Sequence, residues 1–180
     1  TGFSQYILDD LLDNSMRKRR FADKTFDNFL LYGNHQDRQG KVLSYVREFA
    51  DNFAWHRKQG TWLLFVGNSG AGKGHLCAAI INHITKSGYS ALITKTPRLL
   101  REMKETYKKD AARSQSEILN MLGCIDLLII DEIGVQFGTD AERMIFYEVL
   151  DNRYEAMQPV ILTSNIRNMK TITKLLGERI

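Results

Sequence analysis

The sequence predicts an α/β fold in which helices cover both faces of a parallel β-sheet. Two observations lead to this prediction. Four short apolar runs recur along the chain, at 61–66, 89–94, 126–130 and 159–163, and segments of helical length separate them. Strands that are apolar throughout are typical of sheets covered on both faces. Alternating strands and helices predict right-handed crossovers, with the ligand site beyond the carboxyl ends of the strands.

The composition is that of an ordinary globular domain. The chain has 180 residues, 43% of them hydrophobic and 26% charged, which is enough for one full core. A net charge of +4 permits a nucleic-acid partner without requiring one. Cys77 and Cys124 lack metal-ligand spacing, so we expect buried thiols in a reducing compartment. No apolar run reaches the ~20 residues that span a membrane, so we expect a cytoplasmic protein with no membrane partner.

Two helical patterns precede the first strand. Apolar residues recur at helical spacing at Ile7, Leu8, Leu11 and Leu12. The basic run MRKRR at 16–20 follows, and we expect it to be a solvated linker rather than a nucleic-acid contact. A second stretch places Val42, Val46, Phe49, Ala50 and Phe53 on one helical face. Later helices are predicted at 73–87, at 97–122 with a break, and at 139–157.

The first strand leads into a glycine-rich turn, GNSGAGKG at 67–74. This stretch follows the phosphate-binding pattern G-x-x-x-x-G-K-[ST], except that Gly74 stands where a hydroxyl normally ligates Mg²⁺. Backbone N–H groups at the start of the next helix suit phosphate oxygens, and a lysine there neutralises phosphate charge. The predicted ATP-binding residues are Gly67, Asn68, Ser69, Gly70, Ala71, Gly72, Lys73, Gly74 and His75. The alternative is a tight turn that matches the pattern by chance.

A second polar cluster ends the third strand, DLLIIDE at 126–132. Asp131 is the expected Mg²⁺ ligand, as in P-loop enzymes, and Glu132 would orient or deprotonate the attacking water. Taken alone, an Asp-Glu pair after a strand is often only a solvated strand end. Its position about 60 residues after the phosphate loop favours the catalytic interpretation over that alternative.

Polar groups also follow the fourth strand and close the chain. Asn165, in PVILTSN at 159–165, is a candidate contact for the terminal phosphate or the attacking water. The alternative is that the polar residues here, such as Thr163 and Ser164, simply satisfy backbone groups at the strand end. Arg179, in LLGERI at 175–180, is either a surface residue or an arginine finger for a neighbouring subunit, which in other proteins contributes about 10³–10⁵ in rate.

The ordered motifs GNSGAGKGHL, LLIIDEIG, DNRYE, VILTSN and KLLGERI closely resemble the DnaC family of replicative helicase loaders, and IstB-type transposition helper ATPases share most of them. The resemblance implies a P-loop NTPase of the AAA+ (ASCE) type, a three-layer sandwich with ATP and Mg²⁺ as cofactors. It also implies assembly on a hexameric replicative helicase, contact with single-stranded DNA and self-assembly into a ring or spiral. It implies that FDNF at 26–29 lies near the adenine. We therefore predict a linker at 1–21 and an ATPase domain at 22–180, as part of a longer chain.

The resemblance places a DNA-contacting helical insertion at 94–115. The predicted DNA-binding residues there are Lys95, Arg98, Arg101, Lys104, Tyr107, Lys108 and Lys109. Lysine and arginine would contact phosphates, and the tyrosine would stack on a base. The alternative is a solvated helix face above Leu99, Leu100 and Met103.

The leading interpretation is an ATPase that loads or remodels a replicative helicase, with weak hydrolysis because of Gly74. A transposition helper ATPase is the nearest alternative. A second alternative is a scaffold that binds nucleotide without hydrolysing it. A small-molecule P-loop kinase is disfavoured by the Asp131–Glu132 pair.

Overall fold

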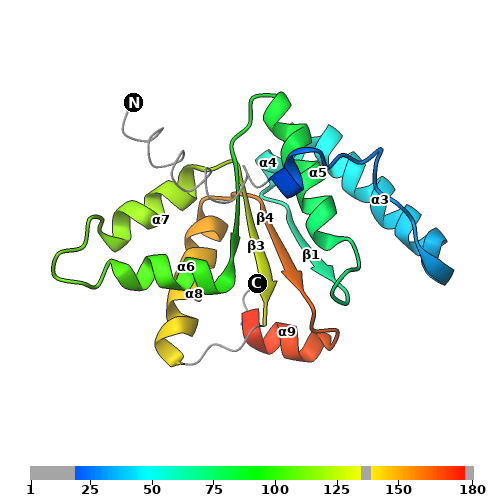
Figure 1. Ribbon diagram of the computed structural model, residues 1–180. Coiled ribbons are helices and arrows are strands. Elements are labelled where there is room, and N and C mark those ends of the chain that lie inside the picture. Colours follow the sequence, from blue (N-terminus) through cyan, green and yellow to red (C-terminus); the bar gives the residue numbers. More distant parts are fainter. Residues whose placement is uncertain (1–18, 135–138, 177–180) are drawn as a thin grey trace.

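The computed structural model describes residues 19–134 and 139–176. Its centre is a parallel sheet of four strands in the order β1-β4-β3-β2 (Figure 1). The strands are β1 (Trp62–Val66), β2 (Ala91–Lys95), β3 (Leu127–Ile133) and β4 (Val160–Ser164). The predicted parallel sheet and all four strands are confirmed, with boundaries shifted by three residues at most. The last strand in the chain lies between the first and the third.

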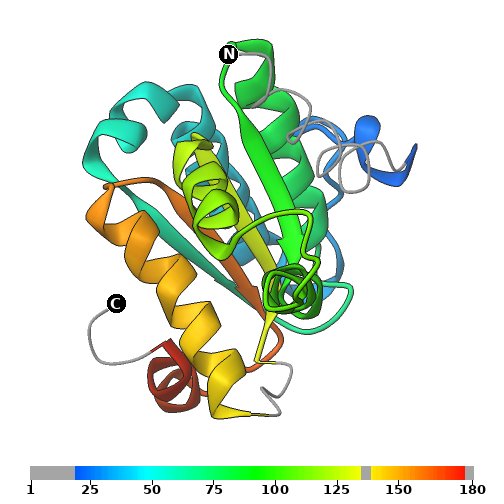
Figure 2. The same ribbon diagram turned by 90° about the vertical axis from the view of Figure 1, so that its left-hand side faces the viewer.

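Helices cover both faces of this sheet and make a three-layer sandwich (Figures 1 and 2). One face carries α3 (Gln36–Asp51), α4 (Phe53–Gln59) and α5 (Lys73–Lys86), preceded by α2 (Arg19–Ala22) and the 3₁₀ turn η1 (Gly33–His35). The other carries α6 (Thr96–Glu105), α7 (Gln115–Cys124), α8 (Asp140–Glu155) and α9 (Met169–Leu176). None of the described helices is both long and apolar enough to cross a membrane.

Each face of the sheet contributes to a separate hydrophobic core, because successive strand side chains point to opposite faces. Leu127 and Ile129 pack toward α3–α5, whereas Leu128 and Ile130 pack toward α6–α8. All four side chains are fully buried. The uniformly apolar sequence of β3 therefore follows from its central position between two helical layers.

Two predicted features of the helices need correction. The amphipathic stretch that includes Val42 and Phe53 forms two helices, because α3 ends at Asn52, whose backbone N–H bonds to carbonyls of the last turn of α3. Val42 is exposed and lines a cleft instead of packing in the core. Cys124 is exposed at the end of α7, whereas Cys77 is buried as predicted.

Two other predictions on the helices have different outcomes. The break within 97–122 is confirmed, and α7 begins with a capping box between Ser114 and Glu117. The helical pattern at 7–12 and most of the MRKRR run lie outside the described residues.

Arg153 holds the chain together where β3 and β4 begin, at the edge of the sheet opposite the carboxyl ends of the strands. Its guanidinium is fully buried and donates hydrogen bonds to the carbonyls of Leu122 (2.7 Å), Ile125 (2.5 Å) and Pro159 (2.5 Å). Burial lowers the pKa of Arg153 to about 10. These bonds satisfy one carbonyl in the last turn of α7 and the carbonyls that shortly precede β3 and β4, and so tie the helix to both strands.

Candidate nucleotide-binding site

The predicted motifs meet at the carboxyl edge of the sheet, where the strand arrows end in Figure 1. The glycine-rich loop follows β1, the carboxylates Asp131 and Glu132 lie near the end of β3, and Asn165 follows β4. Because β4 lies between β1 and β3, Asn165 lies between the loop and the carboxylates. Strand order alone therefore assembles residues that are nearly 100 positions apart.

The glycine-rich loop has the backbone conformation that its glycines permit. Gly70 and Gly72 have φ angles of 78° and 89°, in the left-handed region that other residues avoid. A β-carbon on Gly72 would also lie only 2.7 Å from a ring carbon of Phe29. Gly72 is the N-cap of α5, so the loop runs directly into the first turn of that helix. This is the geometry that binds phosphate oxygens through backbone N–H groups.

Lys73 is the first residue of α5, and its ammonium group lies at the centre of the site. It donates hydrogen bonds to the carbonyl of Gly67 (2.6 Å), the carbonyl of Asn68 (3.0 Å) and Oδ1 of Asn165 (2.7 Å). Burial lowers the pKa of Lys73, and the charges of Asp131, Cys77 and Glu132 oppose that shift. The lysine is therefore held between the loop and the end of β4.

Thr163 links the two carboxylate residues of β3. Its hydroxyl donates a hydrogen bond to Oδ1 of Asp131 (2.5 Å) and accepts one from the backbone N–H of Glu132 (3.0 Å). The pairing of β3 with β4 shifts its register between Ile130 and Ile133, and Glu132 has a φ of 61°. Such irregularities are common beside active sites, where they redirect a side chain. Here Glu132 is turned away from the regular strand.

Lys95 contacts Glu132 directly. The ammonium of Lys95, the last residue of β2, lies 3.0 Å from Oε1 and 2.9 Å from Oε2 of Glu132. We expected Lys95 to belong with the DNA-binding residues. In the structure it lies at the end of the neighbouring strand and neutralises the carboxylate predicted to act on water.

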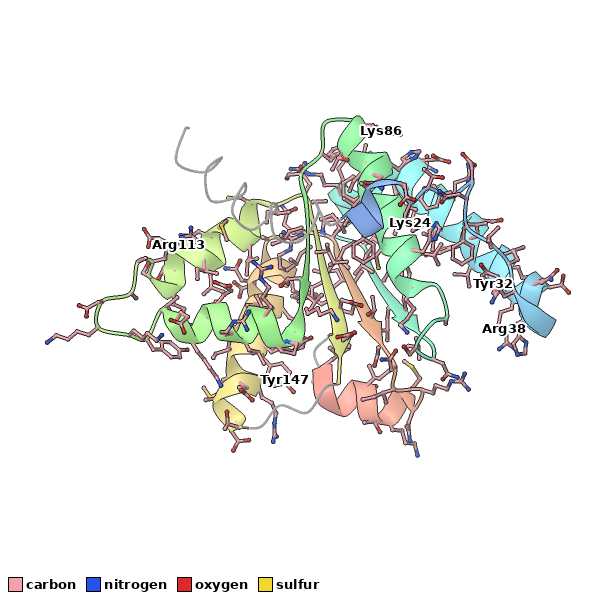
Figure 3. All side chains as sticks on the ribbon, in the orientation of Figure 1. Lys24, Tyr32, Arg38, Lys86, Arg113 and Tyr147 are labelled. Atoms are coloured by element: carbon pink, nitrogen blue, oxygen red, sulfur yellow. The ribbon has the colours of Figure 1, made fainter. Side chains whose placement is uncertain are left out.

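A cleft of about 970 Å³ opens beside the loop. Its lining includes the loop residues 67–71, Lys73, Val42 and Phe29. Two arginines also line it, Arg38 from α3 and Arg167 from the loop after β4, whereas no aspartate or glutamate among the described residues does. Arg38 lies near the start of α3, on the side of the molecule that carries Tyr32 (Figure 3). A cationic cleft of this size suits a phosphorylated ligand.

The FDNF segment and His75 lie on the same side of α5. Phe26 is buried in the core, whereas Phe29 packs edge-on against the His75 ring, with ring centroids 5.1 Å apart. Nε2 of His75 lies 2.8 Å from the carbonyl oxygen of Thr25. The side chain of His75 therefore anchors this segment and is absent from the lining of the large cleft, although the residue was predicted to bind ATP.

The residues present fit a Mg²⁺ ion that arrives with a nucleotide. Within the described residues, no cluster of three or more His, Cys, Asp or Glu side chains could hold a metal by itself. Mg²⁺ usually binds one or two carboxylates together with substrate phosphates and water. Asp131 supplies such a carboxylate, and a β-carbon on Gly74 would have no neighbour closer than 3.8 Å, so the ligand position has room.

The predicted DNA-binding residues divide into two groups. Most of the cations have an intramolecular carboxylate partner: Lys95 with Glu132, Arg98 with Glu102 (3.8 Å), Lys104 with Glu142 (2.5 Å) and Lys108 with Glu105. Across the described ranges, Arg101 and Lys109 form no ion pair, and Tyr107 is 59% exposed. Arg101 and Lys109 are therefore the predicted DNA-binding cations for which the described residues supply no carboxylate partner.

Sequence reasoning missed part of this site. Thr163 was assigned only to the strand end, and Arg167 and Arg38 were not considered. The sequence offered one signal that Arg167 belongs to the site, namely its position two residues after Asn165. Nothing in the sequence indicates that Lys95 pairs with Glu132. Arg179, the candidate arginine finger, lies outside the described residues.

Comparison with known proteins finds a consistent set of relatives. The family model described as IstB-like ATP binding protein matches residues 14–178. The replicative helicase loader DnaC of Escherichia coli (strain K12) is 39% identical over 140 residues, which is 78% of this chain and 54% of that protein. This chain thus spans about half the length of that curated relative.

Solved structures show the same architecture. The crystal structure of the DnaC helicase loader matches with a TM-score of 0.72 and 25% identity, over 89% of each chain. AMPPCP-bound DnaA from Aquifex aeolicus matches with a TM-score of 0.66 and 24% identity, over 82% of this chain and 44% of that one.

Proposed function

This chain belongs to the family of IstB-like ATP-binding proteins and has the fold of AAA+ P-loop proteins, and from this premise we propose that it loads or remodels a replicative DNA helicase on single-stranded DNA under the control of ATP. The observation that carries the proposal is the meeting of Lys73, Asn165 and the Asp131–Glu132 pair at one edge of the sheet. The relative named replicative helicase loader supports the choice of partner.

Each residue of the site has a distinct role in this proposal. The N–H groups of the loop and the ammonium of Lys73 bind the phosphates. Asp131 holds Mg²⁺, which would neutralise charge that develops on the phosphates. Asn165 contacts the terminal phosphate, and Glu132 orients or deprotonates the attacking water. Thr163 keeps both carboxylate residues in position.

The ammonium of Lys95 contacts both carboxylate oxygens of Glu132, so neither oxygen is free to accept a proton from the attacking water. We therefore expect slow hydrolysis in the isolated protein. Movement of Lys95 would release Glu132 and permit faster turnover.

Gly74 is a second reason for slow hydrolysis. Gly74 offers no hydroxyl to a Mg²⁺ ion, so the residues present would fix the ion and the phosphates less tightly for in-line attack. Nucleotide binding survives on the loop N–H groups and Lys73.

A Gly74→Thr variant tests this point. It is expected to bind Mg²⁺·ATP more tightly and release phosphate faster, by roughly tenfold or more. A magnesium titration of ATP affinity and of phosphate release measures both effects. Gly74→Ala is the matched control, because it removes the helix cost of glycine without adding a hydroxyl. If threonine and alanine behave alike, the missing hydroxyl does not limit turnover.

The unpaired cations Arg101, within α6, and Lys109, which follows this helix, are expected to bind single-stranded DNA. The double variant Arg101→Glu and Lys109→Glu should weaken this binding and lower its salt slope by about 0.7 for each lost phosphate contact. Reversal of Lys104 and Lys108 should have a smaller effect, since carboxylates already neutralise both.

Fluorescence anisotropy with a labelled oligonucleotide at several salt concentrations measures the slope. Lys86→Glu is the control, because Lys86 is exposed at the far end of α5, away from α6 (Figure 3). Equal affinity for the double variant and the control at low salt would make this surface a plain solvated face.

Co-purification with a hexameric replicative helicase, with and without ATP, tests the proposed partner. We expect ATP-dependent capture by the wild-type protein. Capture of a transposase in place of the helicase would identify a transposition helper. Capture of the helicase with no phosphate release, even with DNA present, would indicate a non-hydrolysing scaffold.

Self-assembly is part of the same proposal. In a ring or spiral, Arg179 of one subunit would reach the nucleotide of its neighbour as an arginine finger. Loss of ATP-dependent assembly or turnover in an Arg179→Ala variant, measured by sedimentation and phosphate release, would support this role.

A further inference from the structure

Arg167 lies in the cleft that we assign to the nucleotide, beside the phosphate loop. It lines this cleft together with the loop residues 67–71 and Lys73. The side chain is exposed, and among the described residues it forms no ion pair. A guanidinium without a described ion-pair partner, in a cleft that no carboxylate of the described residues lines, is available to an anion.

The backbone around Arg167 is held close to the phosphate loop. β4 pairs with β1 up to the register position Val66–Ser164, and the N–H of Gly67 donates to the carbonyl of Ser164 (3.1 Å). Asn165, the next residue, accepts a hydrogen bond from the ammonium of Lys73 (2.7 Å). The chain therefore leaves β4 directly alongside the loop.

The residues on either side of Arg167 are anchored by their own contacts. The N–H of Ile166 donates to the hydroxyl of Ser164 (3.0 Å), and the side chain of Ile166 packs over Gly134. On the other side, Oδ1 of Asn168 accepts hydrogen bonds from the N–H groups of Lys170 (3.0 Å) and Thr171 (3.4 Å) at the start of α9. Arg167 thus stands on a short connection that is fixed at both ends.

From this placement we infer that Arg167 is a phosphate-binding residue that contacts the terminal phosphate of the nucleotide bound in the same chain. The inference rests on the proposed function, because it requires a nucleoside triphosphate in the cleft. Lys73 and Asn165 mark the position of the outer phosphates, and Arg167 follows Asn165 by two residues. A guanidinium forms two parallel hydrogen bonds with phosphate oxygens.

This role also compensates for Gly74. A loop that lacks the usual hydroxyl has one fewer protein ligand to fix the ion that neutralises the phosphates. A guanidinium from the connection after β4 supplies positive charge to the same phosphates directly. Arg167 therefore lets the chain distinguish a nucleoside triphosphate from a diphosphate.

The test is calorimetric titration with AMPPCP, a triphosphate analogue, and with ADP, both in the presence of Mg²⁺. Arg167→Gln is expected to weaken AMPPCP binding roughly tenfold or more, because hydrogen bonds to charged groups are lost, and ADP binding by no more than about threefold. Arg167→Lys should recover part of the loss. Lys170→Gln, which removes one charge from α9 outside the cleft, should change neither affinity.

Two results would overturn the inference. Unchanged AMPPCP affinity in Arg167→Gln would show that the arginine does not bind phosphate. An equal loss for AMPPCP and ADP would place it on a part of the nucleotide common to both. Melting of each variant without nucleotide checks that the fold is retained. Either result leaves the proposed function intact if the wild-type protein still binds AMPPCP and captures the helicase. Failure of the wild-type protein to bind nucleotide would instead reject the proposed function itself.

Discussion

Replacement of Lys73 by alanine is expected to abolish nucleotide binding while the fold persists. The ammonium group is the cation at the centre of the site, and within the described ranges its hydrogen bonds go to the loop carbonyls and Asn165, whereas neither hydrophobic core includes Lys73. The wild-type protein should gain about 2.7 kcal/mol in free energy of unfolding at an ATP concentration one hundred times the Kd. Thermal melting with and without Mg²⁺·ATP measures this gain, which the variant should lack.

Lys86→Ala provides the control for this experiment. Lys86 is an exposed cation at the opposite end of α5, so its removal should leave the ATP-dependent shift unchanged. If Lys73→Ala melts with the same shift as the wild-type protein, the glycine-rich loop does not bind the phosphates of ATP. A variant that is unfolded without nucleotide would instead show that Lys73 stabilises the loop through its three hydrogen bonds.

Glu132→Gln is expected to stop hydrolysis while ATP still binds. Glutamine keeps the size of the side chain but has no basicity, and loss of a positioned general base lowers turnover by about 10²–10⁴. The backbone cost of a φ of 61° at this position is similar for both residues. Phosphate release in the presence of helicase and DNA gives the rate, and the melting shift with ATP confirms that binding persists.

A Lys95→Met variant separates the two effects of the Glu132→Gln substitution. Glu132→Gln removes the base and also the ion pair with Lys95, whereas Lys95→Met removes only the ion pair. We expect Lys95→Met to retain turnover or to increase it, because no ammonium group then occupies the Glu132 oxygens that would face the water. If Glu132→Gln turns over ATP at the wild-type rate, another group activates the water.

Several elements of the site were predictable because their signals are local. The glycines at 70 and 72 adopt positive φ angles, and a run of apolar residues before Asp131 forms a strand buried on both faces. Both signals depend on a few consecutive residues and their backbone preferences. The polar residues were expected to meet because each motif follows the carboxyl end of a strand in a parallel sheet.

Local signals were insufficient where the surroundings of a residue are set by a distant segment of the chain. The basic residues of 95–109 looked alike in the sequence, yet Lys95, Lys104 and Lys108 are paired with carboxylates that lie on other elements or one turn away. Val42 has the spacing of a core residue, yet α3 extends past the sheet and exposes it to the cleft. Periodicity shows on which face of a helix a residue lies, but it does not show whether that face packs against the core or lines a cleft.

The sequence by itself determined the parallel sheet, the phosphate loop, the carboxylates at the end of β3 and the missing hydroxyl at Gly74. These properties depend on residue type and on short-range spacing. Only the tertiary structure decided that Lys95 neutralises Glu132, that Thr163 links the two carboxylate residues, and that Arg167 enters the cleft. The reason is physical: Coulomb and hydrogen-bond energies depend on distances of a few ångströms, and such distances between side chains on different strands are set by the order and register of the sheet.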